Sequence, residues 1–255
     1  MSSAVTKKRR LILARRWFWF GSLLALVVGF TLPGAELKEA QQEFISGDYA
    51  GCITTAQKAL KDGEESDEWP LLLSQSLLAT GQYLEARTVI TNALEHHRRN
   101  IRLSWQAREA FLANGQPDKA HEMLENIGWV IGRHPSDFSE ASDLVISGKA
   151  ALALGIDPKK VLDRIFDAAI KSDPKLRDVY LAAGDLALAK HDYALAAKKF
   201  QQGLTELPGD PDLLFGLAQA YAPNESPLML ASLEKALERN SNHVGSLLLL
   251  ADHAI

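Results

Sequence analysis

The sequence predicts an all-α protein built from repeated pairs of antiparallel helices. Gly47, Gly81 and Gly115 stand 34 residues apart, and each is followed by a polar turn and then by apolar residues at helical spacing. Pro174 and Pro208 are separated by the same 34 residues. A fixed period of this length indicates stacked structural units, each packed on its neighbours, rather than one large core.

The segments that follow the three glycines share residue types. They read GDYAGCITTAQKAL, GQYLEARTVITNAL and GQPDKAHEMLENIG. The small residues at the same phase of these segments are Cys52, Ala86 and Ala120. The pattern resembles the tetratricopeptide repeat (TPR), a helix-turn-helix unit of this length. The resemblance implies a TPR-type α-solenoid of antiparallel helix pairs that form a right-handed superhelix, and it implies a protein-binding scaffold.

About six repeats and a half repeat are predicted over residues 36–255. Repeat one is predicted to contain helices over 36–46 and 49–61, and the first helix of repeat two begins near Pro70, because proline is tolerated in a first helical turn. A helix ending near Arg133 is followed by an inserted loop at 135–142, which holds breaker and capping residue types.

Repeat four follows over 143–174, with its turn at 155–158. Repeat five matches the TPR pattern best, and repeat six lacks the turn glycine. The matching residues of repeat five are Tyr180, Gly184, Asp192, Tyr193, Ala196, Phe200 and Pro208. From His243 the sequence predicts the first helix of a seventh repeat with an exposed apolar stripe. This half repeat either caps the array or opens the continuation of a longer protein, and we expect the second.

The amino-terminal region predicts a single membrane-spanning helix. Residues 17–35 are uncharged, and a helix of this length covers about 28 Å, close to a bilayer core of about 30 Å. Six basic residues lie in the preceding segment, 1–16, and acidic residues follow. The positive-inside rule then predicts a cytoplasmic amino terminus with the repeats across the membrane.

The same segment is compatible with an anchor or with a cleaved signal peptide. Small residues are expected at positions −3 and −1 of a signal cleavage site, and cuts after Gly34 or Ala35 place Leu32 or Pro33 at −3. An uncleaved signal-anchor is therefore favoured. The expected localisation is a bacterial inner membrane, single-pass, with the repeats on the periplasmic side, and the alternative is a periplasmic or secreted protein.

Charge and cysteine content exclude several classes of function. Beyond residue 35 the chain has 22 basic and 32 acidic residues, so nucleic acid is not expected as a partner. The single cysteine, Cys52, cannot form an intrachain disulfide. A zinc-peptidase pattern beginning at His121 lacks its second histidine, because position 125 is Glu125. No catalytic residue, metal site or cofactor is therefore predicted, and the chain is not expected to be an enzyme.

A groove for a protein or peptide partner is the remaining prediction. In TPR arrays the first helices of the repeats line a concave groove, and the resemblance implies contacts from their second, fifth, ninth and twelfth positions. The predicted groove residues are Leu71, Gln75, Arg102, Trp105, Glu109, Leu181 and Asp185. Trp105 is singled out because tryptophan often anchors interfaces, although a place in the core fits the pattern equally well.

The alternative prediction is the amino-terminal scaffold of a larger exported enzyme. The layout resembles long bacterial TPR proteins that carry a metallopeptidase-like domain after the repeats. The resemblance then implies that the catalytic domain lies beyond residue 255.

Overall fold

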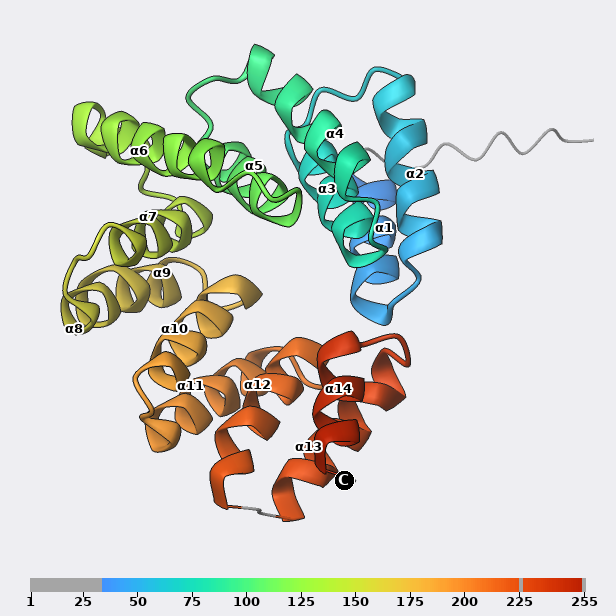
Figure 1. Cartoon of the computed structure of the whole chain (residues 1–255), viewed down its shortest axis with the longest axis vertical. Coiled ribbons are helices and arrows are strands. Elements are labelled where there is room, and N and C mark those ends of the chain that lie inside the picture. The colour runs from blue at the N-terminus through green and yellow to red at the C-terminus, as the bar shows by residue number, and fades with distance from the viewer. Residues whose placement is uncertain (1–33, 225–226, 254–255) are drawn as a thin grey trace, which may run out of the picture. The chain divides into compact units, whose positions relative to one another are not determined.

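The structure, a computed structural model, describes residues 34–224 and 227–253. All the regular elements in these ranges are helical (Figure 1). The α-helices are α1 (Ala35–Ser46), α2 (Tyr49–Lys61), α3 (Glu68–Ala79), α4 (Tyr83–His96), α5 (Ile101–Ala113), α6 (Pro117–Arg133), α7 (Ala141–Ala153), α8 (Pro158–Val161), α9 (Asp167–Ser172), α10 (Arg177–Ala189), α11 (Tyr193–Glu206), α12 (Pro211–Tyr221), α13 (Pro227–Arg239) and α14 (Val244–His253). A π-helical turn over Leu162–Phe166 joins α8 to α9.

The helices form successive pairs, and the first helices of neighbouring pairs also pack on one another. Each helix contacts the next along the chain, as in α5 with α6 and α10 with α11. The contacts between first helices join α1 with α3, α3 with α5, α5 with α7, α7 with α10, and α10 with α12. This arrangement confirms the predicted all-α, TPR-type solenoid, whereas its right-handed sense stays a prediction.

Left-handed backbone at the repeat turns explains the glycine period. Gly47, Gly81 and Gly115 have φ angles of 83°, 77° and 67°. The amide of the residue after each glycine bonds back across the helix end, as Asp48 N does to Glu43 O at 2.9 Å. A residue with a Cβ is strained in this conformation, so glycine is favoured. In repeat five His191 takes the equivalent place, with φ of 57°.

Most predicted helix limits agree with the structure to within two residues. The predicted helix over 49–61 matches α2, and α6 ends at Arg133 as predicted. Helix α3 begins two residues before Pro70, which therefore lies in the first turn. The insertion forms a 3₁₀ turn over Pro135–Asp137, and α7 begins at Ala141, so the loop ends two residues earlier than predicted.

The predicted membrane segment lies almost wholly outside the described residues. Only Gly34 and Ala35 of the range 17–35 are described, and Ala35 is already the first residue of α1. None of the helices within the described ranges is both long enough and apolar enough to cross a membrane.

Close packing of glycine against aromatic rings holds neighbouring repeats together. Phe200 of α11 is fully buried, in a cluster that includes Tyr180 and Leu213. A Cβ at Gly184 of α10 or Gly216 of α12 would overlap the Phe200 ring. Phe166 and Gly148 make the equivalent contact in repeat four. The absence of side chains at these glycines therefore lets Phe200 pack between α10 and α12, and lets Phe166 pack against α7.

Substitution of Gly216 by alanine should destabilise the array. Because an added methyl would push into the Phe200 ring, we expect Gly216→Ala to lower the free energy of unfolding by roughly 1–3 kcal/mol in urea titration. The matched control is Gly132→Ala in α6, where no heavy atom lies within 4 Å of the new Cβ. That change should be neutral or stabilise by up to about 1 kcal/mol. Equal effects of the two changes would contradict the packing described.

Candidate protein-binding cavity

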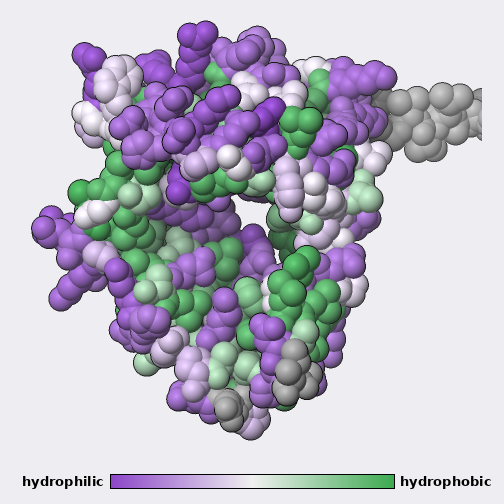
Figure 2. All heavy atoms as spheres, viewed as in Figure 1, coloured by the Kyte–Doolittle hydropathy of each residue, from purple (hydrophilic) through white to green (hydrophobic). Residues whose placement is uncertain are grey.

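The first helices of the repeats line a cavity of about 1250 Å³. Side chains from α1, α3, α5, α7 and α10 contribute to its wall, together with Asp212 of α12. Figure 2 shows the molecule hollowed near the middle of the face drawn. Residues on one helical face line the cavity, as in α5, where Arg102, Trp105, Gln106 and Glu109 recur at helical spacing.

Six of the seven predicted groove residues line this cavity. They are Leu71, Gln75, Arg102, Trp105, Glu109 and Asp185. Leu181 does not line it and packs against the apolar cluster between α10 and its neighbours. The lining residues of α10 include Ala182, Asp185 and Leu186, so Leu181 is one position, or about 100°, away from the cavity face. Whether the six residues bind a partner stays a prediction.

Trp105 has both of the environments considered for it from sequence. It is half-buried and packs against the apolar cluster of Ile101 and Leu124, yet it also lines the cavity. The Arg108 guanidinium carbon lies 4.8 Å from the ring centroid, and the Lys149 ammonium nitrogen lies 6.0 Å from it. Cations over an indole face are attracted to its π electrons, so Trp105 holds two positive charges beside the cavity.

Two arginines of the cavity wall are neutralised by carboxylates of neighbouring repeats. Arg102 pairs with Glu68 and lies 3.9 Å from Asp143. Arg177 pairs with Asp210 at 2.7 Å and with Asp212, both from the next repeat, and with its neighbour Asp178 in α10. These arginines therefore tie adjacent helix pairs together and add little net charge to the cavity.

Three lysines of the wall have no such carboxylate. Lys149, Lys175 and Lys190 line the cavity, and the structure records no ion pair for them within its described ranges. Asp185 is the acidic counterpart, and Lys149 is the positive charge that acts on it. The Asp185 carboxylate is reached by solvent, but protein surrounds it on the concave surface, and this loss of bulk water raises its pKa.

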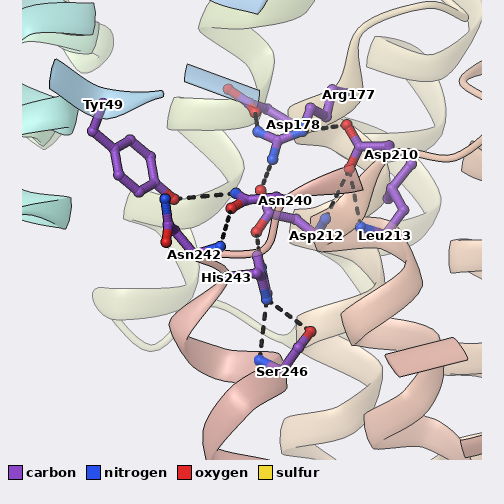
Figure 3. A network of polar contacts seen from close by, with 10 residues as sticks. All are labelled: Tyr49, Arg177, Asp178, Asp210, Asp212, Leu213, Asn240, Asn242, His243 and Ser246. Carbon is purple, nitrogen blue, oxygen red and sulfur yellow. Dashed lines mark hydrogen bonds and ion pairs between the residues drawn. The ribbon is translucent and has the colours of Figure 1, made fainter. Parts of the chain in front are cut away.

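Beside the cavity, hydrogen bonds join Ser246, His243 and Asp212 in a row. The sequence analysis did not predict this group. His243 Nε2 lies 2.7 Å from Asp212 Oδ1, and its Nδ1 lies 2.8 Å from Ser246 Oγ (Figure 3). Asp212 precedes the other two by about one repeat, so sequence spacing gives no local signal. The grouping invites comparison with hydrolase triads, which are recognised by geometry.

The hydrogen bonds identify this group as a helix cap. The Ser246 amide donates to His243 Nδ1 at 3.1 Å, so Nδ1 carries no proton and the Nε2–H donates to Asp212. Ser246 is fully buried, so its hydroxyl cannot meet a substrate. His243 thus caps the first turn of α14, in place of the usual serine or aspartate.

Burial of His243 lowers its pKa, and the nearby Arg177 cation acts in the same direction, against a smaller opposing effect of Asp210. Both causes favour the neutral ring that the cap requires. No set of three or more histidine, cysteine or acidic side chains within the described ranges is placed to hold a metal ion.

Comparison with known proteins supports the fold. No family model matches the chain, and no curated protein matches it either. Among solved structures, TTC0263, a thermophilic TPR protein of Thermus thermophilus, aligns with a TM-score of 0.55 and 22% identity over 73% of this chain and 98% of that chain. A structure of a human IFIT1 dimer with PPP-AAAA aligns with a TM-score of 0.56 and 13% identity over 81% of this chain and 50% of that chain. These likenesses show a TPR-type fold.

The His243 cap should make stability depend on pH. A histidine whose pKa falls on folding contributes stability that is complete above its unfolded value of 6.5 and is lost as the pH falls below it. We therefore expect the thermal midpoint to fall between about pH 7.5 and about pH 5.5. His243→Asn keeps a capping acceptor without this titration, so its midpoint should fall less.

The matched control for this change is His96→Asn, at an exposed position at the end of α4. It should keep the pH dependence of the natural chain. A His243→Asn variant with the same pH dependence as the natural chain would contradict the assignment of the cap.

Proposed function

We propose that the chain is a protein-interaction scaffold whose cavity binds one segment of a partner polypeptide that carries apolar and acidic side chains. The observation that carries the proposal is the continuous row of first-helix residues facing one cavity of about 1250 Å³.

The volume of the cavity suits a segment rather than a folded domain. A helix with its side chains is about 10–12 Å wide and rises about 1.5 Å per residue, so about ten residues fill a space of this size. A small folded domain is several times larger. The wall also offers apolar contacts from five helices, among them those of Phe44, Leu71, Ile146 and Leu186. Such contacts favour a segment with several apolar side chains.

The unpaired charges of the wall favour an acidic segment. Five basic and five acidic side chains line the wall, and those without an ion pair among the described residues are Lys149, Lys175 and Lys190 against Asp185. Because like charges at an interface are repelled and opposite charges guide encounter, an acidic segment is preferred over a basic one.

Labelled peptides test the binding directly. Three probes of about ten residues, which alternate Leu with Glu, with Gln or with Lys, are titrated with purified full chain and followed by fluorescence anisotropy. We expect affinity to fall in the order Glu, Gln, Lys. Lys149→Ala should weaken binding of the Leu/Glu peptide about fivefold, which corresponds to ~1 kcal/mol for one partly exposed charge pair.

The matched control is Lys198→Ala on the exposed side of α11, away from the cavity wall, and it should not change the affinity. Equal binding of the three peptides would contradict the acidic preference. Binding of none of them, with binding of a single-stranded oligonucleotide, would overturn the proposed partner class.

We also propose that residues 17–35 tether this scaffold to a membrane, with the repeats outside the cytoplasm of a bacterial cell. The support is the uncharged run preceded by six basic residues.

Alkaline carbonate extraction tests the tether. The full chain should stay in the membrane fraction and keep its intact amino terminus, as measured by mass spectrometry. The double change Leu24→Arg and Val27→Arg should release it, because each arginine at the centre of a spanning helix costs about 3 kcal/mol. A soluble form that begins near Glu36 would instead show a cleaved signal peptide.

A further inference from the structure

Polar contacts between the described repeats mostly join neighbouring units, whereas one contact joins the first repeat to the last. Within the array, side chains about one repeat apart meet repeatedly. These pairs are Arg102 with Glu68, Asn100 with Asp67, Gln106 with Ser74, Lys199 with Asp167, and Arg177 with Asp210. Such contacts are expected, because each unit of a repeat array touches its neighbours. Contacts between the first and last pairs are not expected on this basis.

A pair of hydrogen bonds joins the turn after α1 to the loop before α14. Asn240 Nδ2 donates to Tyr49 Oη at 3.3 Å, across 191 residues of sequence. Asn242 Nδ2 donates to the carbonyl oxygen of Gly47 at 3.2 Å. Asn240 is almost fully buried, and its Oδ1 also accepts from the Asn242 amide at 3.0 Å. Figure 3 shows the Tyr49 hydroxyl pointing toward the two asparagines.

Among the three turn glycines with a 34-residue spacing, only Gly47 lies too close to a neighbouring side chain to carry a Cβ. A Cβ on Gly47 would overlap the Asn240 side chain, whereas nothing lies within 4 Å of a Cβ on Gly81 or Gly115. All three have left-handed backbone, so the turn alone explains glycine at each. The close approach of Asn240 is an additional constraint at the first repeat only.

The contact is polar and small. The apolar cluster of the first repeats contains Ala40, Cys52 and Leu73, and that of the last contains Ala218, Met229 and Leu233, and neither cluster includes residues of the other end. The ends therefore meet mainly through hydrogen bonds, each of which contributes little net stability because water replaces it when the contact opens. Neighbouring repeats, by contrast, share buried apolar surface.

We propose that the contact of Gly47 and Tyr49 with Asn240 and Asn242 is a clasp that opens and closes the cavity between the first and last repeats. Helix α1 ends at the clasp and supplies Phe44 and Ile45 to the cavity wall. On the other side of the clasp, Asp212 belongs to the same wall and forms a hydrogen bond with His243. Opening therefore parts the wall at this point. A partner segment within a longer chain has no free end to thread, so it enters through the open clasp; this role in binding rests on the proposed function.

Distance measurement between spin labels tests the clasp without any partner. Labels on Ser46→Cys and Ser241→Cys, both exposed and next to the contact, report the separation of the two ends by pulsed electron paramagnetic resonance. The single natural cysteine, Cys52, is buried and escapes labelling. We expect one short distance in the purified full chain and a minor longer one. Tyr49→Phe should raise the longer population roughly fivefold, and Gly47→Ala should make it dominant.

Equivalent positions one repeat later supply matched controls. Tyr83→Phe and Gly81→Ala change the same residue types at the same phase, and Gly81→Ala carries the same backbone strain without meeting Asn240. Both should leave the distances as in the natural chain. Equal effects of Gly47→Ala and Gly81→Ala, or a long distance already dominant in the natural chain, would overturn the clasp.

Stopped-flow binding separates the clasp from the proposed function. If the Leu/Glu peptide binds, Tyr49→Phe should raise the association rate for a longer peptide whose two ends are blocked by folded domains, and Tyr83→Phe should not. If Tyr49→Phe changes the spin-label distances as expected but leaves the association rate of the blocked peptide unchanged, the role of the clasp in partner entry is overturned. Failure of the peptide to bind would contradict the proposed function and leave the distance test standing.

Discussion

The seating of an aromatic ring against glycines of neighbouring first helices is the constraint on which the rest of the array depends. Phe200 can lie between α10 and α12 only because Gly184 and Gly216 carry no side chain. This close approach brings α10 and α12 together, and the first helices from α1 to α10 each turn one face to the cavity. Hydrophobic burial between neighbours thus fixes the helix phase, and helix phase selects the side chains that a partner meets.

The charged residues of the cavity wall form two groups: those whose charge is paired with another repeat, and those whose charge faces the cavity. Arg102 and Arg177 each meet carboxylates from a neighbouring repeat, so their charges are used within the fold. Lys149 and Asp185 face the hollow, where protein displaces bulk water and raises the pKa of the Asp185 carboxyl. Both side chains line the cavity, where a bound segment would meet them.

The fold and much of the cavity wall could be predicted from sequence, because both follow from a local period. Left-handed turns require glycine, so Gly47, Gly81 and Gly115 disclosed the repeat, and phase then placed Arg102 and Trp105 on the inner face. Leu181 lies one position away from the cavity face although its repeat keeps the period, and the α7 face with Lys149 was not predicted, because it follows the inserted loop where the period slips. The contact of Tyr49 with Asn240 joins residues 191 positions apart, and no local pattern encodes it.

Hydrogen exchange measured by mass spectrometry on the full chain, with and without the Leu/Glu peptide, tests the binding surface most directly. Binding in the cavity predicts slower amide exchange in α3, α5, α7 and α10, which supply its wall, and unchanged exchange in the outer helices α4, α6 and α11. Protection confined to the outer helices would show that a partner docks elsewhere and would contradict the cavity as the binding site.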